Sequence, residues 1–296
     1  MALAARPDLR RIIDLDVSQR ASERCKICQS EALFFAEVDL GKSCSSNPYP
    51  LGRYGLDIPY YQCAECGFIF TVAFDGFTDR QWREFIYNDD YAKVDPAYVE
   101  ERPRSNAFVS DAYLKAVGGS PIGLDYGGGN GLAAALLRER GWDYDSVDPH
   151  GGKDHVTAHG LYRFCTSFEV FEHAPTPQAV LKDLSDRCAV GRLLVLIGTN
   201  VSDGAVSPKT KLDWWYAGPR NGHISLYSRK ALKLLAAGGG FRYLSLGRNL
   251  HFLSRGYGRE EVLRIAIEGK LRRILGAPKD PVGPASEKMT LSPDRA

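Results

Sequence analysis

The sequence predicts an α/β fold with a mainly parallel sheet, preceded by a small cysteine-rich domain. From Pro121 onward, strand-like apolar runs alternate with helix-like runs, an order typical of parallel strands joined by crossover helices. Residues 1–75 differ, because they hold five of the seven cysteines and few helical patterns. We therefore predict a four-cysteine domain at 1–75, a helical linker at 76–118, an α/β domain at 119–257, and a C-terminal helix with a tail at 258–296.

Periodicity and turn residues place the elements of the α/β domain. Strands are expected at IGLDY, YDSVD, RFCTSF and RLLVLIGT, with a late strand pair at YLSLG and HFLS. Helices are expected over residues 132–140, 177–188 and 228–237; proline opens the second, and three glycines follow the third. We expect a last amphipathic helix over 258–275 and a disordered polar tail over 278–296.

The linker is expected to hold two helices. Trp82 and Phe85 would share one face of the first helix, and Ser105 would cap the second. The pair Arg102-Pro103 is expected to separate the two, because the residue before a proline avoids the helical conformation.

Composition argues against several classes of protein. A hydrophobic share of 44% and a charged share of 25% are ordinary for a soluble globular protein. A net charge of +2 offers no strong electrostatic footprint for nucleic acid. No apolar run approaches the roughly 20 residues that span a bilayer, and the N-terminus lacks the apolar core of a signal peptide. We expect a cytoplasmic protein without nucleic acid or membrane as a partner, and the sequence leaves its oligomeric state open.

Four cysteines form two C-x-x-C pairs, Cys25 with Cys28 and Cys63 with Cys66. Two such pairs suit a tetrahedral zinc ion, because each tight turn presents two sulfurs to the metal. The alternatives are two unrelated buried pairs or a redox-active C-x-x-C. A site closed by four cysteines has no open coordination position, so we expect a structural Zn²⁺ that stabilises the N-terminal domain.

The stretch LDYGGGNG joins a predicted strand to a predicted helix. Gly127, Gly129 and Gly131 would let the backbone approach a ligand closely. Read as GNGLAA, the loop fits the GxGxxA form of dinucleotide-binding proteins, which is a weak signal alone. Asp148 ends the next strand, where a carboxylate can accept hydrogen bonds from ribose hydroxyls. The loop thus suits a dinucleotide or S-adenosylmethionine, or it is a tight turn without a ligand.

An acidic residue before the glycines favours S-adenosylmethionine. The carboxylate of Asp125 would repel a pyrophosphate, whereas it suits the ammonium at the amino-acid end of the sulfonium cofactor. The downstream order, FEVFEHAPTPQAVLKDL followed by RLLVLIGT, continues in the same sense.

Together, DYGGGNG, Asp148, FEVFEH and GRLLV resemble the motif series of class I S-adenosylmethionine-dependent methyltransferases over residues 105–255. The resemblance implies a Rossmann-like sheet of seven strands, with helices on both faces and a late antiparallel hairpin. It implies cofactor contacts at Asp125, Gly127, Gly129, Gly131, Asp148, Phe168 and Glu169. With a zinc-ribbon-like N-terminal domain, the chain also resembles zinc-containing methyltransferases of sugar-nucleotide and secondary-metabolite pathways. The segment after Asp148 is short, so the adenine pocket is not assigned.

Glu169, Glu172 and His173 form an E-x-x-E-H motif at the carboxyl end of a predicted strand, where α/β sheets bind ligands. If helical, the three side chains share one face. The motif resembles one with which some methyltransferases of RNA 2′-hydroxyls and of catechols hold a divalent cation, helped by a later histidine. Such a cation would lower the pKa of a substrate hydroxyl. The alternative is that the motif only caps and orients a helix.

His223, in WWYAGPRNGHISLYS, is the predicted general base, because imidazole accepts a proton near neutral pH. A hydrogen-bonded structural histidine is the alternative. Arg220 would bind a phosphate or carboxylate if its segment lines a substrate pocket, and Tyr87 and Tyr91 either close over the cofactor or simply pack within the linker. Three neighbouring aromatic residues either line a substrate pocket or anchor a surface loop: Trp214, Trp215 and Tyr216.

These observations lead to three functional hypotheses. We expect an S-adenosylmethionine-dependent methyltransferase that methylates a small molecule, such as a sugar nucleotide, glycan precursor or secondary metabolite, on oxygen. The second hypothesis is an RNA methyltransferase whose zinc segment binds RNA, which the near-neutral charge disfavours. The third is a non-catalytic zinc-binding module that senses the cofactor.

Overall fold

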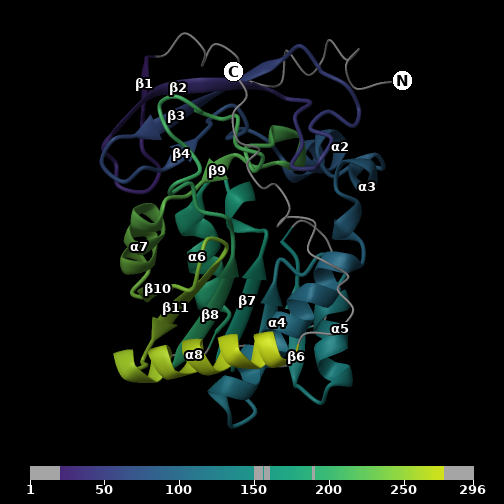
Figure 1. Cartoon of the computed structure of the whole chain (residues 1–296), viewed down its shortest axis with the longest axis vertical. Helices are drawn as coiled ribbons and strands as arrows, with labels where there is room; N and C mark the ends of the chain where they lie inside the picture. The colour runs from purple at the N-terminus through teal and green to yellow at the C-terminus, as the bar shows by residue number, and fades with distance from the viewer. Residues whose placement is uncertain (1–20, 150–155, 157–160, 189–190, 277–296) are drawn as a thin grey trace, which may run out of the picture.

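A computed structural model describes residues 21–149, 156, 161–188 and 191–276. They form two sheets that lie one above the other along the long axis of the molecule (Figure 1). One sheet has six strands in the order β10-β11-β8-β7-β5-β6, and the other has five in the order β1-β2-β3-β4-β9. The expected disordered tail at 278–296 lies outside the described residues. Within the described part, no helix is both long and apolar enough to span a membrane.

The six-stranded sheet confirms the predicted α/β fold and its late antiparallel pair. Its four parallel strands are β5 (Gly123–Tyr126), β6 (Tyr144–Val147), β7 (Phe164–Phe168) and β8 (Leu193–Gly198). Two antiparallel strands complete it, β11 (Leu250–Arg255) against β8 and β10 (Arg242–Ser245) against β11. The resemblance implied seven strands; six are formed by the described residues, and most of the segment between β6 and β7 lies outside them.

Helices cover both faces of this sheet, as expected. On one face, Phe164, Leu194 and Leu196 share an apolar core with α4 (Glu101–Val117), α5 (Leu132–Glu139) and α8 (Arg259–Leu275). On the other face, alternate residues of the same strands pack on α6 (Pro177–Asp186) and α7 (Arg229–Gly238). A strand that alternates between two apolar cores must be apolar throughout, which explains the wholly buried run LLVLIG in β8.

The linker differs from its prediction at the start of α4. It comprises α2 (Asp79–Phe85), α3 (Tyr91–Val94), the short η3 (Pro96–Tyr98) and α4. The predicted break at Arg102-Pro103 and the predicted cap at Ser105 are both wrong, because α4 already begins at Glu101. Pro103 lies in the first turn, where a backbone N–H has no partner within the helix, so a proline there costs no hydrogen bond.

The five-stranded sheet draws on two distant parts of the chain. Its N-terminal strands are β1 (Ser22–Arg24), β2 (Glu31–Asp39), β3 (Asp57–Cys63) and β4 (Ile69–Phe70). The edge strand beside β4 is β9 (Ser225–Leu226), which follows β8 in the sequence and precedes α7. A core of side chains from β2, β3, α2 and the segment before β9 joins the two parts. The N-terminal strands and the later part of the chain are therefore joined by strand pairing as well as by this core.

Candidate active site

The four predicted cysteine ligands come together from two turns. Cys25 and Cys28 follow β1, and Cys63 and Cys66 lie between the end of β3 and the start of β4. Their sulfurs all lie within 4.8 Å of one another. The Sγ atoms are 3.5 Å apart both from Cys25 to Cys66 and from Cys28 to Cys63. Zinc–sulfur bonds of about 2.3 Å in a tetrahedron give sulfur–sulfur distances near 3.8 Å, so a zinc ion fits this cluster. The hydrogen bond between the two thiols lowers the pKa of Cys25 to about 5 and raises the pKa of Cys66.

The glycine loop has the backbone geometry that only glycine adopts readily. Gly127, Gly129 and Gly131 have φ angles of +79°, +55° and +75°. A Cβ atom on Gly127 would lie 2.2 Å from a methyl carbon of Val170, so the backbone passes close to the loop that follows β7. At Gly127, packing against Val170 therefore leaves no room for a larger residue.

Asp148 supports the same loop, since its carboxylate accepts a hydrogen bond from the Gly129 N–H over 2.9 Å. The loop also meets the linker: Asn130 Nδ2 donates to the Val99 carbonyl, and a Cβ on Gly129 would lie 3.2 Å from the Tyr98 hydroxyl. The segment around η3 thus covers the glycine loop.

Asp125 lies beneath the loop. Its carboxylate accepts a hydrogen bond from the Thr166 hydroxyl over 2.8 Å. A Cβ on Gly128 would lie 2.9 Å from Asp125 Oδ2, so the loop crosses directly over the carboxylate. Burial raises the pKa of Asp125 to about 6.

Phe168 and Glu169 stand at the carboxyl end of β7, as expected. The Phe168 ring packs over Gly198, where an added Cβ would lie 2.3 Å from a ring carbon. Glu169 has a φ of +54°, an unfavourable conformation for a residue with a side chain, and strained residues of this kind cluster at functional sites. Burial raises the pKa of Glu169, and the positive charge of Arg102 opposes that change.

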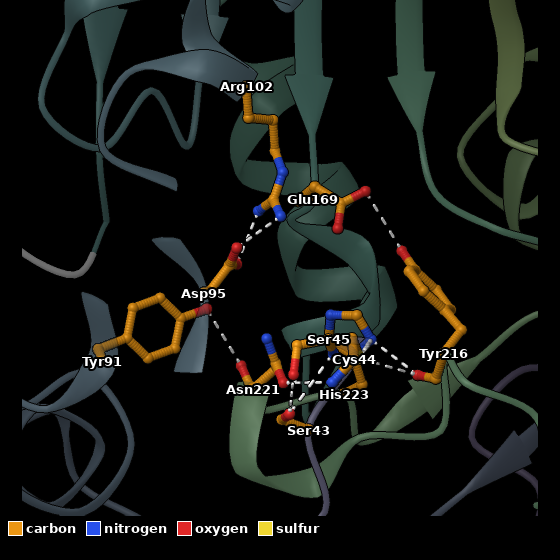
Figure 2. A network of polar contacts seen from close by, with 10 residues as sticks. All are labelled: Ser43, Cys44, Ser45, Tyr91, Asp95, Arg102, Glu169, Tyr216, Asn221 and His223. Atoms are coloured by element: carbon orange, nitrogen blue, oxygen red, sulfur yellow. Dashed lines mark hydrogen bonds and ion pairs between the residues drawn. The ribbon is translucent and has the colours of Figure 1, made fainter. Parts of the chain in front are cut away.

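Arg102 is held by Asp95 through two hydrogen bonds of 2.8 and 2.7 Å, which form a bidentate ion pair (Figure 2). The pair lies beside Glu169 in the same polar network. The sequence indicated no place in the site for either residue, because neither belongs to a site motif and the linker helices bring them together only in the fold.

The E-x-x-E-H motif does not lie on a single helix, so the condition under which its three side chains would share one face is not met. The helix η4 covers only Phe171–His173, and Glu169 precedes it in a left-handed conformation. The structure instead groups Glu172, His173 and His223, whose candidate ligand atoms lie within 4.8 Å of one another. Glu169 is outside that group and contacts the Tyr216 hydroxyl at 3.5 Å.

Glu172 is completely buried and receives a hydrogen bond from the Tyr216 hydroxyl to Oε1. Its other oxygen, Oε2, is one of the few buried side-chain atoms in the described part of the chain without a hydrogen-bond partner. Burial and the nearby charge of Glu169 both raise the pKa of Glu172 well above its usual value. A carboxyl group in this state would gain from a cation or a donor at Oε2.

His223 is buried, with 3% of its surface exposed, and its ring is held in one orientation. Nδ1 lies 2.8 Å from the Tyr216 carbonyl oxygen, so Nδ1–H donates to it and Nε2 carries the lone pair (Figure 2). Cys44 Sγ lies 3.3 Å from the same nitrogen. Burial lowers the pKa of His223 to about 3, so the ring is neutral at physiological pH.

Arg220 does not serve the predicted role. It is fully buried and donates to the Ile86 carbonyl, to Asn88 Oδ1 and to the Tyr54 hydroxyl, at 2.7, 3.0 and 3.3 Å. A buried guanidinium recruits hydrogen-bond acceptors from the protein itself, and here these acceptors fix the end of α2.

The predicted aromatic residues have unequal environments. Tyr216 is buried within the site, whereas Trp215 is 41% exposed. Tyr87 packs its ring against His173 at 6.0 Å between centroids, and the Tyr91 hydroxyl lies 3.5 Å from the Asn221 carbonyl. Both linker tyrosines thus lie beside the candidate active site.

Cys44 is a site residue that sequence reasoning missed. It stands alone in the sequence, without a partner at metal-ligand spacing. Cys44 lies in a loop after β2, 179 residues before His223 in the sequence, so no local pattern could have revealed their contact.

Comparisons with known proteins bear on the part of the chain that carries this site. Residues 98–246, half of the chain, match a family described as a methyltransferase domain. This range runs from η3 to the turn after β10 and includes both the glycine loop and His223. A search of curated proteins gave no match.

Solved structures similar to the chain are also methyltransferases. A SAM-dependent methyltransferase from Thermotoga maritima, a possible histamine N-methyltransferase, is 14% identical with a TM-score of 0.35, over 53% of this chain and 94% of that one. A mitomycin 7-O-methyltransferase is 17% identical with a TM-score of 0.44, over 62% of each chain. A plantazolicin methyltransferase in complex with SAH is 14% identical with a TM-score of 0.42, over 68% of this chain and 90% of that one.

The family match covers a large part of the site. The glycine loop, Asp148 and the residues that follow β7 all fall within 98–246, at the carboxyl ends of the parallel strands. The chain therefore belongs to the methyltransferase domain family, and the protein is an enzyme.

Proposed function

We propose that the protein transfers the methyl group of S-adenosylmethionine to a hydroxyl of a small molecule, with His223 as the general base. The observation that carries this proposal is the neutral, oriented imidazole of His223, grouped with Glu172 and His173. Val170, which lies between the two glutamates, packs against Gly127 and joins the two halves of the site.

The residues around the glycine loop suit S-adenosylmethionine. The loop leaves no room for a Cβ at Gly127, and Asp148 stands at the end of β6 with its carboxylate at the Gly129 N–H. The carboxylate of Asp148 would accept the ribose hydroxyls, and Phe168 and Glu169 would border the cofactor. When bound, S-adenosylmethionine supplies a methyl group activated by the positive charge on sulfur.

In the proposed step, His223 Nε2 takes the proton of the acceptor hydroxyl. The oxygen then forms a bond to the methyl carbon as the carbon–sulfur bond breaks, and the bond's electron pair returns to sulfur. The products are a methyl ether, S-adenosylhomocysteine and a protonated His223. A positive charge on the ring would favour ionisation of Glu172, whose carboxyl oxygen lies within 4.8 Å of a His223 nitrogen, and the resulting carboxylate would offset the charge that burial disfavours.

Zn²⁺ at the four cysteines would have a structural role. Four thiolates fill a tetrahedral coordination shell, so no position remains for a substrate. In this proposal the N-terminal domain shapes the acceptor side of the site, because Cys44 contacts His223 from that domain.

Acceptor screening tests the proposal. Small molecules that copurify with the protein would be identified by mass spectrometry, and hydroxylated compounds of those classes would be incubated with methyl-labelled S-adenosylmethionine. The proposal predicts a labelled methyl ether and a large loss of turnover in His223→Gln. Full turnover in that variant would exclude His223 as the base. Tight cofactor binding without turnover on any acceptor would favour the sensor, and methylation of RNA alone would favour the RNA enzyme.

A divalent cation at Glu172, His173 and His223 is a second candidate. The orphaned Oε2 of Glu172 favours it, because two imidazoles and one carboxylate form a common ligand set for transition metals. The cation would then activate the acceptor hydroxyl by lowering its pKa, in place of proton removal by His223.

Metal dependence separates the two mechanisms. Under the cation mechanism, a mild chelator abolishes turnover, Mn²⁺ or Co²⁺ restores it, and the circular dichroism spectrum stays unchanged. Glu172→Gln would weaken Mn²⁺ binding measured by calorimetry. Turnover that survives chelation while the four-cysteine zinc is retained would contradict the cation mechanism.

A further inference from the structure

Two residues of the N-terminal domain contact His223, one at its backbone carbonyl and one at its ring. We propose that Tyr60, assisted by Cys44, is a positioning residue for His223. This inference rests on the proposed function, in which His223 contacts the acceptor. The Tyr60 hydroxyl donates a 2.8 Å hydrogen bond to the backbone carbonyl of His223, and both residues are buried.

Tyr60 lies on the strand that also ends in a cysteine ligand. Both Tyr60 and Cys63 belong to β3, which pairs with β4, and β4 pairs with β9. Next to His223, Ile224 donates its N–H to the Glu172 carbonyl over 2.9 Å and accepts the Thr71 N–H over 3.0 Å. The backbone around His223 is therefore anchored both to η4 and to the sheet that follows the cysteine cluster.

Cys44 restricts the ring of His223 from a second direction. Its Sγ lies 3.3 Å from Nδ1, and its N–H donates to Asn221 Oδ1 over 2.9 Å (Figure 2). A Cβ on Gly218 would lie 2.5 Å from the Cys44 sulfur, so the thiol fills the space under this loop. The ring can therefore neither flip nor move back without displacing the thiol.

The consequence concerns the direction of Nε2. With Nδ1–H fixed on the Tyr216 carbonyl, the position of the His223 backbone decides where Nε2 points. Loss of the Tyr60 hydroxyl would leave a buried carbonyl without its partner and allow the loop to shift. Proton transfer requires hydrogen-bond contact, so a small displacement lowers kcat, whereas the cofactor loop is untouched.

The test compares Tyr60→Phe with Tyr243→Phe in the zinc-loaded full-length protein. Tyr243 is the matched control, because its hydroxyl contacts the ring of another buried histidine, His251, at 3.0 Å. NMR spectra of the imidazole nitrogens are recorded with S-adenosylhomocysteine bound. Tyr60→Phe should move the His223 signals and lower kcat about three- to tenfold, as expected for one buried hydrogen bond. The affinity for S-adenosylhomocysteine should not change.

The control and the cysteine variants sharpen the result. Tyr243→Phe should move the signals of His251 and leave those of His223 and kcat in place. Cys44→Ala should move the Nδ1 signal of His223, and Cys44→Ser should restore most of it. Unchanged His223 signals and unchanged kcat in Tyr60→Phe would overturn the inference. Shifted signals with full turnover in both Tyr60→Phe and His223→Gln would support the positioning and overturn the proposed base.

Discussion

The carboxylate of Asp148 accepts the N–H of Gly129 and so ties the end of β6 to the loop after β5. The proposed function adds the ribose of the cofactor to this carboxylate. Asp148→Ala would then weaken binding of S-adenosylhomocysteine about 10- to 100-fold, the range for lost hydrogen bonds to a charged group. Isothermal titration calorimetry measures the change. Asp143→Ala, at an exposed position just before β6, is the control, and equal affinities in both variants would contradict the assigned site.

Gly127→Ala tests the steric role of the loop. The substitution forces a side chain into a positive φ and places a Cβ 2.2 Å from Val170. We expect the free energy of unfolding to fall by about 1–2 kcal/mol from backbone strain and by about 1–3 kcal/mol more from the clash. Gly141→Ala has a φ of +87° but open space around it, so it should show the strain alone. Urea denaturation compares the two, and equal losses would argue against close packing at Gly127.

Cys63→Ser tests the proposed zinc site. Removing one of four ligands should reduce bound zinc from about one ion per chain to a small fraction and destabilise the protein by several kcal/mol, because metal binding supports folding of small domains. Elemental analysis and thermal unfolding measure both effects. Cys165→Ala is the control: its thiol is buried beside Cys188, outside the four-cysteine cluster, and zinc should be retained. Absence of zinc in the purified wild-type protein would exclude the site.

Asp125 should give the protein a pH-dependent stability. Its pKa is about 6 in the folded protein and 3.8 ordinarily, so the folded state binds the proton more tightly. Stability should therefore fall as the pH rises from about 4 to about 6, by about 3 kcal/mol at most, and stay level above that window. In Asp125→Asn this component should vanish. The check is chemical denaturation of both proteins between pH 4 and 7; parallel curves would contradict the raised pKa.

The sequence predicted the α/β domain well because its elements carry local signals. The run LLVLIG became a wholly buried strand, and Ser228 caps α7 by accepting the N–H of Ala231. The predicted helix break at Pro103 was wrong because a proline in the first turn of a helix and a proline that ends a helix look alike in the sequence. Local patterns alone cannot distinguish the two cases.

The candidate site was predictable only in part. Spacing or sequence context indicated the cysteine pairs, the glycine loop and His223 as candidate site residues. No local pattern indicated Cys44, Asp95 and Arg102, because their contacts depend on how distant elements meet. The prediction for Arg220 was wrong because the sequence does not show burial. A buried arginine that donates hydrogen bonds within the protein cannot be told from one that binds a substrate phosphate.

Strand β9 has a consequence for exchanging parts between homologous proteins. Two residues of the catalytic half, Ser225 and Leu226, complete the sheet of the N-terminal half through the pairs Phe70–Ser225 and Ile69–Leu226. A chimera that joins the first 75 residues of one homologue to the remainder of another must therefore match this seam, although the splice point lies far from it in sequence. Otherwise the sheet edge opens, and an open edge invites pairing between chains and aggregation.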